Sequence, residues 1–103
     1  MYIYSVTLQV DKSIEKEWLN FMQKKHINDV MKTGYFDKCV MRKGVPEKSS
    51  VYTLYNVEYI AKSEDDYIMY EYEFAQELRD ETKERFGTNL KIVRNFYEVI
   101  FEK

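Results

Sequence analysis

The order of the hydrophobic patterns constrains the fold of this chain more than any other feature. Residues 2–10, YIYSVTLQV, alternate between two faces, as a strand with one buried face does. The next stretch spaces Ile14, Trp18, Phe21 and Met22 at helical intervals, so a helix follows the strand. The remaining elements are expected at residues 27–31 (a second short helical piece), 36–43 (strand), 51–61 (strand), 63–86 (helix) and 90–103 (strand). The predicted order is therefore β-α-β-β-α-β.

Several residues are expected to mark where these elements begin and end. Asp11 or Ser13 can cap the first helix, and Ser63, followed three residues later by Asp66, resembles a capping box. Gly34 stands where a helix commonly ends in the left-handed conformation. The segment GVPEKSS, residues 44–50, is the clearest loop, and it predicts a hairpin between the strands on either side.

This order most simply gives one four-stranded antiparallel sheet with both helices on one face. The strands would lie side by side in the order fourth, first, third, second. We expect a single ferredoxin-like α+β domain over residues 1–103, because a chain of this length forms one domain. Two helices can cover only one face of such a sheet, so the other face is expected to be bare.

Composition and charge exclude several classes of function. The formal charge is −2 and there is no basic run, so nucleic-acid binding is not expected. No apolar run approaches the roughly 20 residues of a membrane span, and the alternating start does not resemble a signal peptide. Cys39 is the only cysteine and cannot form an internal disulfide, which favours a reducing cytoplasm.

Three stretches resemble a known family: WLNFMQKKHINDVMKTGYF, DDYIMYEYEFAQELRDETKERFG and RNFYEV. They are similar to a small bacterial domain of unknown function, related to the dimeric α/β-barrel superfamily. The resemblance covers nearly the whole chain. It implies the ferredoxin-like fold and a homodimer whose two sheets face each other. It implies no particular activity, because relatives in the superfamily include cofactor-free monooxygenases, haem-degrading enzymes, lactone isomerases and ligand sensors, and fold does not choose among them.

His26 is the only histidine and the candidate catalytic residue, since Cys39, a lone cysteine in a strand, is more often an inert small hydrophobe than a nucleophile. It could act as a general base, because the unperturbed pKa of histidine lies near neutrality. The alternative is structural: His26 closes the first helix, where a donor meets the exposed carbonyls. The second interpretation is favoured, because no orienting partner is evident nearby in the sequence. No metal or other cofactor is expected, since one His, one Cys and three scattered glycines make neither a zinc set nor a phosphate loop.

The bare sheet face is the other candidate site. Alternation places Gln9, Asn56, Glu58, Arg94 and Glu98 on this face as weak candidates for ligand contacts. The same reasoning mixes apolar residues among them, namely Leu54, Ile60, Ile92, Phe96 and Ile100. Such a face suits a dimer interface with paired charges or a cavity lined by two sheets. By contrast, the charged residues of the second helix, including Glu77, Arg79 and Glu84, are expected on its solvated side.

Two functional hypotheses follow. In the first, the chain is a cytoplasmic dimeric α/β-barrel protein that binds a small ligand or has a structural role. In the second, it is a cofactor-independent oxygenase or isomerase acting on a hydrophobic small molecule, with His26 handling a proton. A cavity of roughly 300 Å³ or more with convergent polar groups would favour the enzyme.

Overall fold

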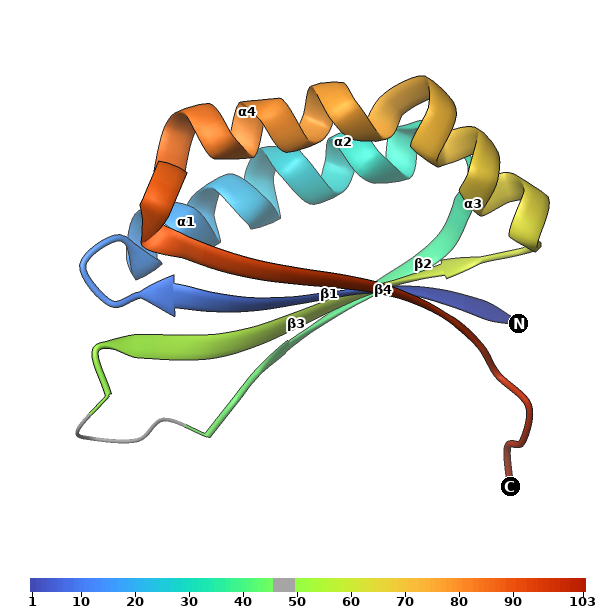
Figure 1. Cartoon of the computed structure of the whole chain (residues 1–103), viewed down its shortest axis with the longest axis horizontal. Coiled ribbons are helices and arrows are strands. Elements are labelled where there is room, and N and C mark those ends of the chain that lie inside the picture. Colours follow the sequence, from blue (N-terminus) through green and yellow to red (C-terminus); the bar gives the residue numbers. More distant parts are fainter. Residues whose placement is uncertain (46–49) are drawn as a thin grey trace.

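The computed structural model describes residues 1–45 and 50–103, and these form a helical layer over one sheet (Figure 1). The first half contains β1 (Tyr2–Asp11), α1 (Glu15–Phe21), a π-helical segment η1 (Met22–His26), α2 (Ile27–Lys32) and β2 (Phe36–Lys43). The second half contains β3 (Tyr52–Ala61), α3 (Glu64–Tyr70), a second π-helical segment η2 (Glu71–Ala75), α4 (Gln76–Phe86), a 3₁₀ turn η3 (Gly87–Asn89) and β4 (Leu90–Glu98). None of the helices in these residues is long and apolar enough to cross a membrane.

The sheet has four strands in the order β2-β3-β1-β4, and every neighbouring pair is antiparallel. Both helical stretches lie on one side of it, and the opposite face is uncovered (Figure 1). The predicted ferredoxin-like topology and strand order are therefore confirmed. Of the predicted loop at 44–50, Gly44, Val45 and Ser50 carry no regular structure, and residues 46–49 lie outside the described residues.

The first helical stretch is continuous, which corrects the prediction of two pieces. The backbone remains helical through Met22, His26 and Ile27, so His26 lies inside the helix and does not close it. A π turn contains more residues than the 3.6 of an α turn. Residues four apart in the sequence therefore lie closer to a single line along the helix. Trp18, Met22, His26 and Val30 thus stay on the side that faces the sheet. The stretch ends at Gly34, whose φ of 84° is the predicted left-handed conformation.

The cap of the second helix is confirmed, whereas that of the first is not. Ser63 Oγ accepts a hydrogen bond from the Asp66 amide at 3.1 Å. At the first helix, Ile14 occupies the cap position without a side-chain hydrogen bond. Asp11 instead closes the preceding turn, accepting hydrogen bonds from the amide and hydroxyl of Ser13 at 2.8 and 2.7 Å.

The core lies between the sheet and the helices and is rich in aromatic rings. Trp18 is fully buried, and its ring centroid lies 4.8 Å from that of Tyr55, so the prediction that it packs against the sheet is confirmed. Tyr4 and Phe36 stack at 6.1 Å, and both contact Tyr59. Stacked and tilted ring pairs of this kind add to the stabilisation from burial itself.

The predicted facing of β4 is wrong. Arg94 pairs with Val6, and Phe96 with Tyr4, so even-numbered residues of β4 share the helix-facing side. Phe96 stacks on Tyr67 with 3.9 Å between centroids, and Ile92 packs against the core. The alternation of residues could not predict which face of β4 is buried, because β4 carries apolar residues on both faces. A shift of one residue in the register exchanges the two faces. The bare face therefore does not include Arg94, Glu98, Ile92 or Phe96, and Ile100 lies beyond the end of the strand.

The predicted facing of β1 and β3 is correct. Gln9 pairs with Leu54, Thr7 with Asn56 and Ser5 with Glu58, and all six lie opposite the buried helix-facing residues. The register of β4 adds its odd-numbered residues to this bare face, namely Lys91, Val93, Asn95 and Tyr97.

Candidate active or binding site between helices and sheet

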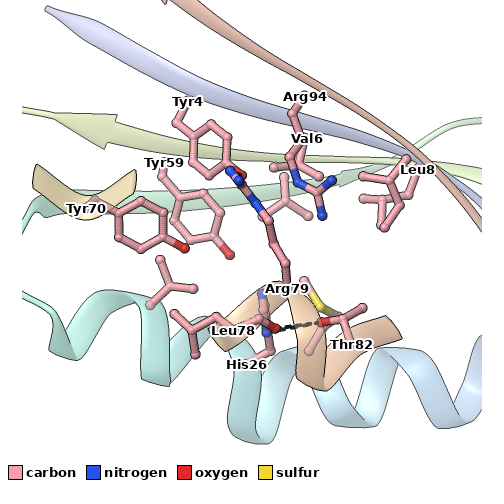
Figure 2. A pocket seen from close by; sticks show the side chains of 14 residues that line it. Tyr4, Val6, Leu8, His26, Tyr59, Tyr70, Leu78, Arg79, Thr82 and Arg94 are labelled. Carbon is pink, nitrogen blue, oxygen red and sulfur yellow. Dashed lines mark hydrogen bonds between the residues drawn. The ribbon is translucent and has the colours of Figure 1, made fainter. Parts of the chain in front are cut away.

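A cavity of about 40 Å³ lies inside the chain, between the helical layer and the sheet. Its walls are mostly apolar and come from every layer of the fold: β1, β3, β4 and both helical stretches (Figure 2). The apolar lining residues are Val6, Leu8, Met22, Val30, Val57, Leu78 and Ile92. The cavity therefore lies on the opposite side of the sheet from the inter-sheet space that the sequence indicated.

Two polar groups are buried at this cavity without a well-formed hydrogen bond to the described residues. They are the hydroxyl of Tyr59, a residue only 2% exposed, and Nε of Arg79. Burial, with a smaller effect from the Cys39 thiol, raises the pKa of Tyr59, so the hydroxyl stays neutral and can donate. Because buried donors are normally paired, two unpaired donors beside one cavity indicate a site for a ligand or ordered water.

Arg79 is fixed in place by a carboxylate and a hydroxyl. Its guanidinium binds Glu71 through both terminal nitrogens, with 3.0 Å for the Nη1–Oε2 pair, and donates to the Tyr4 hydroxyl at 2.9 Å. Burial opposes ionisation of Glu71, but hydrogen bonds from Arg79 and Tyr67 outweigh it and lower the pKa of Glu71. Glu71 begins the π-helical segment η2, and such segments are frequent at functional sites.

His26 also lines the cavity, from the end of the π-helical segment η1 (Figure 2). Removal of the ring from water lowers the pKa of His26 below its usual 6.5, although Glu81 and Asp29 act in the opposite direction. The imidazole is therefore neutral at pH 7. Its Nδ1 lies 3.5 Å from the Thr82 hydroxyl, which is the polar partner that the sequence did not reveal.

Arg94 stands where the cavity meets the surface. It is exposed, and it makes no hydrogen bond or salt bridge to the part of the chain that the structure describes. A groove of about 400 Å³ runs outside it, between α4 and β4, lined also by Gln76, Asp80 and Lys83. Cavity and groove share four residues, Arg79, Thr82, Ile92 and Arg94, so the groove is the natural entrance.

The structure brings together only two of the residues singled out in the sequence, His26 and Arg94. The others lie elsewhere, and Asn56, Glu58 and Glu98 have partners of their own. Asn56 donates to Ser5 and Thr7 at 3.0 and 3.2 Å, and Glu58 pairs with Arg42 at 2.6 Å rather than with Arg94. Glu98 accepts a hydrogen bond from the Tyr2 hydroxyl at 2.9 Å. Gln9 is on the bare face, in a shallow surface pocket with Tyr52 and Lys91.

Sequence reasoning missed Arg79, Tyr59 and Thr82. Arg79 was expected on the solvated side of its helix, and the structure contradicts this because it reaches the Tyr4 hydroxyl on the sheet. A signal did exist: Arg79 follows the buried Ala75 by four residues and so lies on the same helix face.

The remaining candidates for a reactive or metal-binding group are Cys39 and the acidic residues. The thiol is half buried, and burial raises its pKa to about 11, so it stays protonated near neutrality. Among the described residues, no group of three or more His, Cys, Asp or Glu side chains could hold a metal ion.

The fold and this site define a ferredoxin-like α+β protein with a small, mostly apolar cavity under its helices. Residues 1–100 match the family model described as a domain of unknown function, DUF4286, and the chain belongs to that family. No curated protein matches it in sequence.

Solved structures share the fold at low identity. A structure described as an ethyl tert-butyl ether d (EthD) family protein from Bacillus halodurans has a TM-score of 0.68 and 12% identity, covering 97% of this chain and 100% of that one. A proposed monooxygenase from Shewanella loihica has a TM-score of 0.61 and 14% identity, covering 98% and 96%. A dimeric ferredoxin-like protein from an uncultured marine organism has a TM-score of 0.62 and 10% identity, covering 99% and 97%. At such identities the likeness establishes the fold alone.

Proposed function

We propose that this chain binds a small molecule in the cavity between its helices and its sheet. The observation that carries the proposal is the pair of buried donors at the same cavity, Tyr59 Oη and Arg79 Nε, which have no well-formed hydrogen bond within the described residues. A core polar group without a partner is costly, by about 1–3 kcal/mol. A ligand that accepts hydrogen bonds from both removes that cost. The cavity alone is smaller than a drug-sized pocket, so the ligand is small or extends into the groove.

Ligand-observed NMR with a library of small aliphatic and aromatic fragments tests this proposal. Ile92→Trp fills the boundary between cavity and groove, and Tyr72→Trp adds an indole at an exposed position that lines neither. Fragments should bind the wild type and Tyr72→Trp but not Ile92→Trp. Fragment binding that survives in folded Ile92→Trp, or no binding to the wild type, contradicts the site.

We also propose that two copies associate through the bare sheet face. Leu54, Val93 and Tyr97 lie exposed on that face, where an apolar area favours association. The Arg42–Glu58 pair and the polar residues of β1 lie among them and can fix the register of a two-fold interface. One of the structures with the same fold is described as dimeric, which supports the association of two copies.

Light scattering at micromolar concentration tests the dimer. The wild type should have about twice the chain mass of 12.6 kDa. Val93→Glu should shift it toward the monomer, and Tyr72→Glu, an exposed change on the helical side, should not. Phe96→Glu is not a suitable test of the interface, because Phe96 lies under the helices and not on the bare face. A monomeric wild type, or a dimer unaffected by Val93→Glu, contradicts this interface.

A second candidate function is a cofactor-independent oxygenase or isomerase acting on a hydrophobic small molecule. The observation that favours it is His26, a neutral imidazole at the cavity wall and therefore able to accept a proton. Oxygen uptake or isomerisation measured with a panel of small phenols and lactones should be abolished in His26→Ala. An activity that persists in folded His26→Ala excludes His26 as the base.

A further inference from the structure

The hydrogen-bonding groups around the cavity are nearly all donors. Among the described residues, the Tyr59 hydroxyl and Arg79 Nε lack a well-formed hydrogen bond, and the Arg94 guanidinium makes no hydrogen bond or salt bridge. Glu71, the carboxylate that holds Arg79, already accepts hydrogen bonds from Arg79 and Tyr67. His26 Nδ1 faces Thr82. A ligand that satisfies this site must therefore bring acceptors.

The charges at the cavity entrance also favour a ligand that brings acceptors, and in particular an anion. Arg79 is neutralised by Glu71, whereas Arg94 has no salt bridge within residues 1–45 and 50–103. In the groove Lys83 adds a second cation, and Asp80, the only acidic residue there, accepts a hydrogen bond from Gln76 at 2.8 Å. Within the described residues Arg94 is thus an arginine without a salt bridge at the mouth of a mostly apolar cavity, in a chain whose formal charge is −2. It attracts anions and can bind a carboxylate with two parallel hydrogen bonds.

We propose that the ligand is a small monocarboxylate, held by Arg94 at the cavity mouth, with acceptor oxygens reaching the Tyr59 hydroxyl and Arg79 Nε. This rests on the binding function proposed above. One unneutralised arginine at the cavity matches one negative charge. Lys83 lines the groove and not the cavity, so the second charge of a phosphate dianion would enter an apolar space without a cation of its own, which is strongly unfavourable. The small cavity admits a short aliphatic group, and the groove accommodates a longer or aromatic one.

Isothermal titration calorimetry with matched pairs of compounds tests the inference. The probes are butyrate and benzoate, their neutral amides butyramide and benzamide, and inorganic phosphate. Each carboxylate should bind at least about 10-fold more tightly than its amide, as expected for a charge-assisted hydrogen bond. Phosphate should bind more weakly than either carboxylate.

Variants separate the anion site from the cavity itself. Arg94→Gln should weaken carboxylate binding about 10-fold and leave amide binding unchanged, and Arg94→Lys should restore part of it. Lys32→Gln removes the same charge from an exposed position of α2 that lines neither cavity nor groove, and it should change nothing.

The outcomes distinguish this inference from the function on which it rests. Amides that bind as tightly as carboxylates, and that are excluded by Ile92→Trp, would overturn the anion site and leave the ligand cavity standing. Phosphate binding more tightly than the carboxylates, or carboxylate binding unchanged in Arg94→Gln, would also overturn it. If no probe binds at concentrations of about 10 mM, both the inference and the proposed function fail.

Discussion

Replacing Trp18 with alanine tests the core that supports the cavity. Trp18 is 0% exposed, and its ring packs 4.8 Å from the centroid of Tyr55. Truncation of a buried tryptophan costs about 3–5 kcal/mol. The indole N–H, however, has no hydrogen-bond partner among the described residues, and removing a buried unpaired donor recovers about 1–3 kcal/mol. We therefore expect Trp18→Ala to lower the free energy of unfolding by about 2 kcal/mol.

Urea unfolding followed by far-ultraviolet circular dichroism measures this loss without relying on the tryptophan itself. The midpoint should fall while the dependence on urea stays constant, because stability changes and compactness does not. Trp18→Phe is the informative companion, since it keeps a ring against Tyr55 and removes the unpaired N–H; it should cost about 1 kcal/mol or less. A loss below about 1 kcal/mol for Trp18→Ala, or wild-type fluorescence typical of a water-exposed indole, would refute the packing.

Three further predictions concern the helices. NMR titration should find the pKa of His26 below 6.5. The unfolded state then binds more protons than the folded state, so stability should be lost as the pH falls below about 6.5. His26→Gln should remove that dependence on pH. Ser63→Ala deletes the helix cap and should lower the free energy of unfolding by about 1 kcal/mol in urea denaturation, whereas Ser63→Asp should not. Gly34→Ala should cost about 1 kcal/mol, because its φ of 84° strains any side chain although no atom lies within 4 Å of the added Cβ.

The topology was predictable from the sequence because each element has its own periodicity. The alternation of residues 2–10 and the helical spacing through Trp18 and Phe21 both persist in the structure. The stripe of the second helix, with Tyr70 and Phe86 buried, does so as well. Topology rules then leave few ways to arrange the four strands.

The site was only partly predictable, for two physical reasons. The pattern of β4 is apolar on both faces, so the side chain of Arg94 was placed on the wrong side of the sheet. The π-helical segments change the rotation per residue about the helix axis, and the sequence pattern did not predict these segments. The sequence therefore predicted that His26 closes a helix, and its partner Thr82 is 56 residues away in the chain.

An amide-resolved NMR titration with benzoate and benzamide tests most directly whether the ligand site lies between the helices and the sheet. The backbone amides of Leu78, Thr82 and Ile92, which surround the cavity, should show the largest shifts with at least one of the two compounds. Those of Thr7 and Asn56, on the bare face, should not move. Shifts that gather on the bare face, or no shifts with either compound, would contradict the site described above.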